Sequence, residues 1–344
     1  MSLTNSFTNS LADLTWDSLR IPTVVAVLAM VPLLFFDPSL TYISRLFILM
    51  LVFATLAMAL NIVFGHTDQL FLFVGALTGI GAYGTALTAD ALGISPWATL
   101  LVGALLAGAL GTAVCYVAAR RRFTVILIAI LTLALQLAII EAFVGARDIT
   151  GGSTGFSFSG LGLVSVQNAL GLHEHVVLYY LMLALLTGVL LLYHYLRNSK
   201  YGMAFDAIRQ DEIAAEAIGV NVVRYKTIAG FISAFIIGLV GPMYAQLESL
   251  VLPGMFAFNV IDVLVLIILV IGGMRTLLGP IVGAAVMIYI NEELQAAGQW
   301  RTVLFGLLLI VLFLYFRQGI VPFADRVLND RLGLKRRIKS ALPE

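Results

Sequence analysis

Long apolar runs separated by short polar breaks follow one another along almost the whole of this 344-residue chain. Most of them approach the roughly 20 residues that an α-helix needs to cross the hydrocarbon core of a bilayer. The runs lie at 22–36, 42–64, 70–89, 96–118, 123–145, 176–196, 227–247, 260–273, 276–296 and 302–316. The first and eighth are short, and Gly279-Pro280 interrupts the ninth near its start. Because the runs lack the alternation of barrel strands, we predict an all-α polytopic membrane protein with about ten transmembrane helices.

The charge content agrees with this class of protein. Only 11% of the residues are charged and 61% are hydrophobic, whereas a soluble domain is about 25% charged. The net charge of +1 provides no basic face for a nucleic-acid partner. A single cysteine, Cys115, excludes an internal disulfide and a cysteine-rich metal site. We therefore expect no soluble enzyme, no nucleic-acid partner, no bound metal and no cofactor on this chain.

The basic residues are distributed unevenly between the two sides of the predicted membrane domain. With a cytoplasmic N-terminus and ten crossings, seventeen Lys and Arg fall in inner segments, and only Arg147 and Arg301 fall in outer ones. Since Lys and Arg favour cytoplasmic loops, we predict that both termini are cytoplasmic. The domains are then a cytoplasmic segment at 1–21, a membrane domain at 22–316 and a basic tail at 317–344 that rests on anionic lipid.

Two long loops interrupt the pattern of short connections. The outer loop at 146–175 is rich in Gly and Ser, and the inner loop at 197–226 is polar. In the inner loop, Asp211 is a plausible helix N-cap and Gly219 a plausible terminator, which predicts two surface helices at 203–209 and 212–218.

These two helices are too short to be stable alone, so they require a surface to dock on. We expect Ala214, Ala215 and Ile218 to form one small apolar face. The expected polar contacts are Asp206, Arg209, Glu212 and Glu216. From the residues alone, an amphipathic connector on lipid headgroups and a segment that inserts into a partner subunit both remain open.

Two formal enzyme motifs lack the context that their chemistry requires. Gly79–Gly84 matches G-x-G-x-x-G, but no strand or βαβ unit surrounds it. Residues 151–155 match G-x-S-x-G around Ser153, yet none of the four histidines lies in the middle of a span, and a hydrolase also needs a His and an acid that can fold back on the serine. The chain also contains no P-loop sequence, so it has no P-loop ATPase site of its own. We expect that this chain is not an enzyme.

Small residues recur four positions apart within the apolar runs, a spacing that predicts close packing of membrane helices. The pairs are Gly75/Gly79, Gly279/Gly283, Ala107/Gly111 and Ala234/Gly238. Polar residues within the spans are costly and therefore informative. Of these, Asn61, Thr132, Gln136 and Asp262 are candidates either for interhelical hydrogen bonds or for substrate contacts, and no regular carboxylate relay crosses the membrane.

The order of several motifs resembles the LivM-type permease subunits of branched-chain amino-acid ABC importers. The most specific block runs from Ser199 to Gly241 and contains Ala-Ile-Arg-Gln-Asp-Glu-Ile-Ala-Ala-Glu-Ala-Ile-Gly. The other matching segments are Ala59–Gly65, Gly79–Tyr83, Thr150–Gly155 and Ile271–Pro280.

The resemblance implies an ABC importer permease fold, with a second homologous permease, two cytoplasmic ATPases that bind ATP and Mg²⁺, and an extracytoplasmic binding protein as partners. The location it implies is a bacterial or archaeal cytoplasmic (inner) membrane. It places an ATPase-coupling helix at about 206–219, with Ala214, Ala215 and Gly219 as its core. Gln69 and Ser153 join Asn61, Thr132, Gln136 and Asp262 as candidate residues of the translocation pathway.

The chain departs from the family pattern at three places. Glu212 stands one residue early for the usual Glu-Ala-Ala, and Ile213 takes its place. Residues 65–74 keep Gln69 but lack the usual second Gly, the Ser and the Gly after it, and Met274 stands where a Gly is common. The substrate then need not be a branched-chain amino acid, since related permeases carry urea, short amides and other amino acids. A stand-alone secondary transporter or channel is the alternative from another class, and a lone chain that transports in liposomes would identify it.

Overall fold

A computed structural model describes residues 21–33, 41–158 and 173–294 of the chain, together with shorter stretches. The remaining described positions are 35, 160–163, 167, 171, 298, 300, 303–304, 306–307, 310, 319–324 and 326. Nearly all of the predicted N-terminal segment at 1–21, and most of the tenth apolar run and of the tail at 317–344, lie outside these residues. The predicted cytoplasmic location of both termini therefore stays a prediction.

Five of the described helices are long and apolar enough to cross a membrane. They are Tyr42–Gly65, Pro96–Arg120 (α4), Val125–Gly145 (α5), Glu174–Arg197 (α8) and Val222–Glu248 (α11). The first of them comprises α2 (Thr41–Leu60) and a π-helical turn, η1 (Asn61–Gly65). Helices of 21 to 27 residues measure about 32–40 Å, longer than the roughly 30 Å hydrocarbon core. The chain is a multi-pass membrane protein, and the count of ten crossings stays a prediction.

The other apolar runs give shorter or later helices than expected. A helix covers Ile21–Leu33, and α3 spans Val74–Leu92. The predicted third run begins at residue 70, whereas residues 68–73 are not helical, so that prediction is wrong at its start. The eighth and ninth runs form α12 (Asp262–Gly272) and α13 (Gly279–Glu293). Their 11 and 15 residues measure only about 17 and 23 Å.

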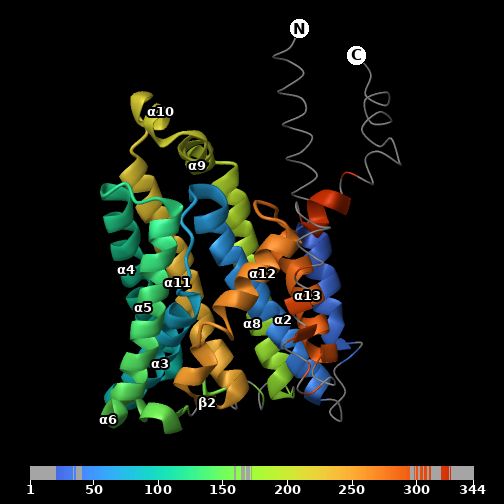
Figure 1. Ribbon diagram of the computed structural model, residues 1–344. Helices are drawn as coiled ribbons and strands as arrows, with labels where there is room; N and C mark the ends of the chain where they lie inside the picture. The colour runs from blue at the N-terminus through green and yellow to red at the C-terminus, as the bar shows by residue number, and fades with distance from the viewer. Residues whose placement is uncertain are drawn as a thin grey trace.

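Gly279-Pro280 begins α13 and does not interrupt it, which corrects the expectation for the ninth run. Proline is tolerated in the first turn of a helix because the N–H that it lacks would have no intrahelical partner there. The Thr276 hydroxyl accepts a hydrogen bond from the Gly279 N–H at 3.0 Å and so satisfies a neighbouring free donor. The two half-length helices α12 and α13 pack against each other and against α2 (Figure 1).

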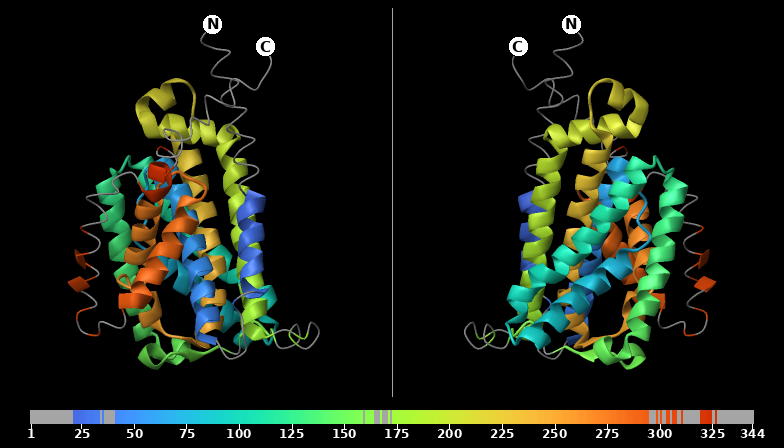
Figure 2. Two further views of the ribbon diagram at one scale, coloured as in Figure 1. Left: turned by 90° about the vertical axis from the view of Figure 1, so that its right-hand side faces the viewer. Right: turned by 90° about the vertical axis from the view of Figure 1, so that its left-hand side faces the viewer.

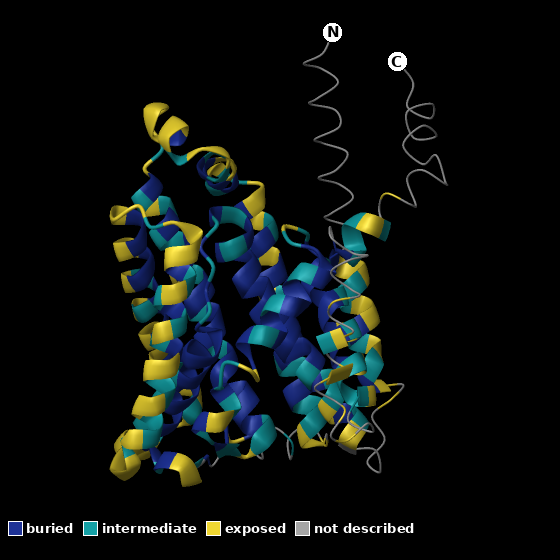
Figure 3. Cartoon of the chain, in the orientation of Figure 1, coloured by how far each residue is buried: buried dark blue, intermediate teal, exposed yellow. Residues whose placement is uncertain are grey.

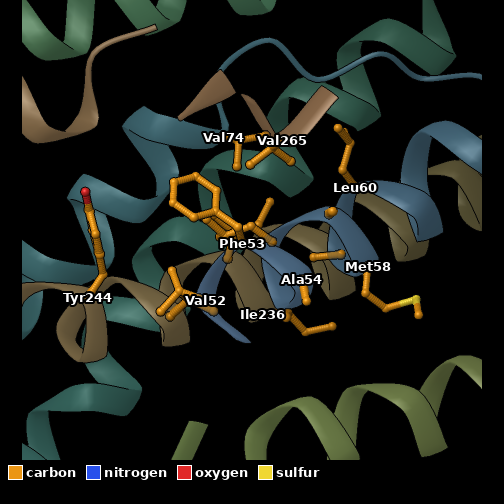
Figure 4. Packing of buried hydrophobic residues seen from close by; sticks show 14 of the residues in the cluster. Val52, Phe53, Ala54, Met58, Leu60, Val74, Ile236, Tyr244 and Val265 are labelled. Carbon is orange, nitrogen blue, oxygen red and sulfur yellow. The ribbon is translucent and has the colours of Figure 1, made fainter. Parts of the chain in front are cut away.

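The centre of the bundle is α2. In the apolar core of the span Tyr42–Gly65, most of which is α2, 83% of the residues are buried, against 17% in α5. Helices α8, α11, α12 and α13 all pack on it, and Figure 4 shows Phe53, Ala54 and Met58 of α2 among the side chains of this core. The exposed residues of α4 and α5 lie at the edge of the bundle, on the left in Figure 3. The periphery is therefore apolar, as a lipid-facing surface requires.

The predicted small-residue pairs do lie at close helix contacts. A Cβ on Gly238 of α11 would lie 2.7 Å from the Ala107 Cβ of α4. One on Gly111 would lie 2.3 Å from the Ala234 Cβ. The Gly283 Cα of α13 approaches α12 in the same way, since a Cβ there would lie 2.2 Å from the Ile268 carbonyl oxygen. The helix-packing interpretation of these pairs is confirmed.

A short irregular layer closes the end of the bundle that the predicted orientation places outside. Helix α6 (Arg147–Thr150) and a 3₁₀ turn, η2 (Gly152–Thr154), lead into strand β1 (Phe156–Ser157). This strand pairs antiparallel with β2 (Leu250–Val251), which precedes the 3₁₀ turn η3 (Pro253–Phe256). The chain is therefore helical with one two-stranded ribbon, and the all-α expectation needs that small correction.

The two predicted inner-loop helices are confirmed at the opposite end of the molecule. They are α9 (Lys200–Gln210) and α10 (Glu212–Ala217), here called the inner helix pair. The pair lies beyond the ends of α8 and α11, which it connects (Figures 1 and 2). We call this end of the bundle the inner end, following the predicted orientation.

Candidate coupling surface and membrane-embedded polar residues

The inner helix pair has well-defined helix ends. Ser199 accepts a hydrogen bond from the Tyr201 N–H at the start of α9, and Asp211 accepts from Ile213 and Ala214 at the start of α10. The second contact confirms Asp211 as the predicted N-cap. Gly219 ends α10 at a φ of +90°, a conformation that favours glycine, so its predicted role as terminator is confirmed as well.

The predicted apolar face of α10 is wrong in its composition. Ala215 is 2% exposed and packs inside the chain against Ile208 and Val222, whereas Ala214 and Ile218 are exposed. A short helix can turn only one narrow face toward its own protein, and the small Ala215 occupies that face because it allows a close approach. The outward-facing apolar side chains of α10 are Ile213 and Ile218, exposed at 71% and 76%, and Met203 of α9 is exposed at 71%.

Two of the four predicted polar contacts pair within the chain. Glu212 forms an ion pair with Lys226 of α11, and Glu216 forms one with Arg122 in the turn between α4 and α5. Asp206 is exposed and Arg209 is partly buried. The inner helix pair is thus fixed to the bundle by two ion pairs and the contact of Ala215, and it presents Asp206 and the exposed isoleucines outward.

Charged groups gather beneath the inner helix pair, around the loop that follows η1. Asp68 lies there at a φ of +52°, and burial raises the pKa of its carboxyl, opposed by the nearby cations Arg209, Arg275 and Lys226. His66 bonds the Tyr193 hydroxyl at 2.8 Å, and burial lowers the pKa of His66 to about 4. The cluster brings together residues of α9, α11, the loop after η1 and the loop before α13.

Sequence reasoning missed Lys226 as a functional candidate. We counted it only as one basic residue of the inner side. It is 3% exposed and stands 14 residues after Glu212, its ion-pair partner. No periodicity connects the two residues, because a turn and the start of α11 separate them. A lysine directly before the predicted start of a span at residue 227 was the one available signal.

Asn61 connects the π-helical turn to the loop between α12 and α13. Its side-chain oxygen accepts a hydrogen bond from the Arg275 N–H at 2.7 Å, and its amide nitrogen donates to the Thr276 carbonyl at 3.1 Å. Asn61 is fully buried. A π-turn adds a residue to the helix and is often found at functional sites; here it presents a side-chain amide to the two backbone groups of a distant loop.

Two further candidates, Thr132 and Gln136, hold the non-helical segment 68–73 and the start of α3 inside the bundle. Thr132 of α5 accepts a hydrogen bond from the Leu72 N–H at 3.0 Å. Gln136, one turn further on, accepts from the Ala76 N–H at 2.6 Å and donates to the Phe256 carbonyl at 2.7 Å. Both are fully buried. They satisfy backbone groups that have no water to bond in a membrane.

Asp262 completes the start of α3. Its two carboxylate oxygens accept hydrogen bonds from the Val74 N–H at 2.6 Å and the Gly75 N–H at 3.2 Å. The residue is 1% exposed and opens α12. The positive end of the α3 dipole stabilises a carboxylate at this position. Asp262 therefore acts as an N-cap supplied by a residue 188 positions away.

The last two pathway candidates lie at opposite ends of the bundle. Gln69 is fully buried at the inner end and donates hydrogen bonds to the Thr67 hydroxyl and the Lys226 carbonyl. Ser153 lies in η2 at the outer end and is exposed. The structure thus brings Thr132, Gln136 and Asp262 together around the start of α3 and leaves the other three apart. That any of the six contacts substrate stays a prediction.

Comparison with known proteins agrees with these features. A family described as "Branched-chain amino acid transport system / permease component" matches residues 42–315. A high-affinity branched-chain amino acid transport system permease protein LivM from Escherichia coli is 30% identical over 306 residues, which cover 83% of this chain and 71% of the relative. LivM from Salmonella typhimurium is 28% identical over 304 residues, 82% of this chain and 71% of its own. The chain belongs to the family of permease components of branched-chain amino acid transport systems.

Proposed function

We propose that this chain is the transmembrane permease subunit of an ATP-driven ABC importer for branched-chain or related amino acids. One observation carries the proposal. The inner helix pair lies beyond the membrane-spanning helices, is fixed by caps and ion pairs, and turns Ile213 and Ile218 outward. Exposed apolar side chains on a rigid, polar-flanked surface are typical of a protein interface.

The partner that fits this surface is a cytoplasmic ATPase subunit. The chain has no P-loop sequence, so the partner would bind ATP and Mg²⁺ and the chain itself would not be an enzyme. In the full assembly, a second homologous permease, two ATPases and an extracytoplasmic binding protein would surround this subunit in a bacterial or archaeal cytoplasmic membrane.

Transport in this proposal depends on two conformations of the membrane domain. ATP binding would close the ATPase pair and displace the docked α10. Because Asp211 caps α10 and Ala215 packs into the chain, the helix would move as a rigid element. ATP can shift the equilibrium between the two conformations only if the complex binds ATP more tightly in one conformation than in the other.

The proposed substrate class rests on the relatives. Two permeases of high-affinity branched-chain amino acid transport are similar to this chain over more than four fifths of its length. The sequence has no regular relay of carboxylates across the membrane, which supports a pathway that passes substrate while the binding protein recognises it. Uptake of labelled leucine, with unlabelled isoleucine, urea and acetamide as competitors, would measure the preference.

The docking surface can be tested with three matched substitutions. We expect Ile213→Arg and Ile218→Arg to abolish co-purification of the ATPase and to stop leucine uptake, because each places a charge within an apolar contact. Ile149→Arg is the control, since Ile149 is 62% exposed on α6 at the opposite end. Undiminished ATPase binding and normal uptake by both inner variants would refute the docking site.

A second experiment separates this proposal from a stand-alone transporter or channel. The single chain is reconstituted in liposomes without any ATPase. Uptake of leucine that is absent from the lone chain and present with the complete, ATP-supplied complex supports the importer. Uptake by the lone chain would refute it.

A further inference from the structure

Lys226 is the point at which the inner helix pair reaches the interior of the bundle. The residue lies near the start of α11 and is 3% exposed, and its Nζ lies 2.5 Å from Glu212 Oε1 of α10. Burying a cation without a partner is costly, so the position of the Glu212 carboxylate is determined by the lysine. The ion pair therefore fixes how α10 is oriented against the first turns of α11.

The contact continues from Lys226 into the non-helical segment. The Lys226 carbonyl accepts a hydrogen bond from Gln69 Nε2 at 3.2 Å, and Gln69 is fully buried. Gln69 belongs to the stretch 68–73 that leads directly into α3, and Asp262 caps α3 there. Each step joins two different elements, so α10 is connected to the start of α3 through one lysine.

The other ion pair of α10 differs from this one in the burial of its cation and in the element that it reaches, since the Glu212 side chain is itself 41% exposed. Glu216 pairs with Arg122 at 2.7 Å, and the two side chains are 39% and 66% exposed. Exposed pairs of this kind contribute little stability, and this one ends in a surface turn. Of the two ion pairs, the Glu212–Lys226 contact is the one that leads from α10 to the buried segments.

We infer that the Glu212–Lys226 pair is a positioning contact that makes α10 and the inner end of α11 move as one body. A displacement of α10 then reaches Gln69 and the segment 68–73, whose position changes the packing at the start of α3. The inference rests on the proposed docking of an ATPase at α10, and it assigns the transmission of that motion to two residues.

The key variant is Lys226→Met, because a buried residue cannot contact the ATPase directly. Methionine keeps the length of the side chain, and Glu212, whose side chain is 41% exposed, is hydrated when its partner is removed, so no charge is left buried without a partner. We expect the variant to co-purify with the ATPase as the wild type does, while the leucine taken up per ATP hydrolysed falls by about fivefold or more, the lower end of typical coupling between sites.

The double variant Glu212→Ala/Lys226→Met separates transmission from stability. It removes both charges, so we expect thermal stability close to that of the wild type and the same loss of leucine per ATP as in Lys226→Met. Two substitutions that break one contact are not additive. Arg224→Met is the matched control, since this exposed cation lies on the same turn of α11, and we expect its ratio to stay within about twofold of the wild type.

Three outcomes would contradict the inference. They are a normal ratio in Lys226→Met, recovery of the ratio in the double variant, and an equal loss in Arg224→Met. A wild-type chain that binds no ATPase would instead refute the proposed function, and this inference with it. ATPase binding by the wild type is therefore measured first, so that the two failures are distinguished.

Discussion

Substitution of Asp262 tests most directly how the non-helical segment 68–73 and the start of α3 are held in place. The Asp262 carboxylate accepts two backbone hydrogen bonds, from Val74 and Gly75, at a site that is 1% exposed. In Asp262→Ala both N–H groups lose their acceptor in an interior without water. Each buried unsatisfied donor costs about 1–3 kcal/mol, so we expect the variant to lose roughly 2–4 kcal/mol of unfolding free energy after partial relaxation.

The assay is unfolding by sodium dodecyl sulfate in mixed micelles, followed by the loss of helical circular dichroism. Asp262→Asn keeps one acceptor oxygen and replaces the other with an amide that cannot accept, so about half of the destabilisation is expected. Asp90→Asn is the control, because Asp90 is an exposed residue near the other end of the same helix. Its unfolding free energy should match that of the wild type.

An unfolding free energy of Asp262→Ala within about 0.5 kcal/mol of the wild type, the usual scatter of surface substitutions, would refute the capping role. Uptake provides a second measurement. Because both carboxylate oxygens are engaged by backbone, we expect uptake to fall in proportion to the amount of folded protein. Complete loss of uptake in a well-folded Asp262→Asn would instead show that the carboxylate acts on the substrate.

Two further predictions concern helix packing and pH. Gly81→Ala should sharply reduce the yield of monodisperse protein on size exclusion, because the new Cβ would lie 2.1 Å from the Gly238 carbonyl oxygen; Gly188→Ala, which meets no atom within 4 Å, should leave the yield unchanged. The pKa of His66 falls from 6.5 to about 4 on folding, so the unfolded chain binds more protons in this window and stability decreases as the pH is lowered through it. A thermal-unfolding series from pH 7 to pH 4 should show this slope in the wild type and a reduced slope in His66→Phe.

The long helices could be predicted from the sequence because one signal dominates there. The apolar run 96–118 corresponds to α4, and its start at Pro96 coincides with the observed first residue. The inner helix pair was predictable for another reason, since Asp211 and Gly219 act within their own turn of chain. Local chemistry of this kind is visible in a single sequence.

The non-helical segment 68–73 could not be predicted in the same way. Residues 70–74 are apolar, and hydropathy does not distinguish a helix from an extended chain when both are buried. The non-helical form is stabilised by acceptors from distant parts of the chain, such as Thr132 for Leu72, 60 residues away. Tertiary contacts over such a separation leave no periodicity in the sequence.

The same limit applies to the roles of the membrane-embedded polar residues. The sequence indicates that Gln136 is costly within a span, but a substrate contact and a backbone hydrogen bond require the same residue type. In the structure its oxygen and its nitrogen both bond backbone groups of other elements. Substitution of Gln136 would therefore move the start of α3 and change transport whether or not the side chain meets substrate. A transport defect at this position identifies a substrate contact only when the unfolding free energy of the variant is unchanged.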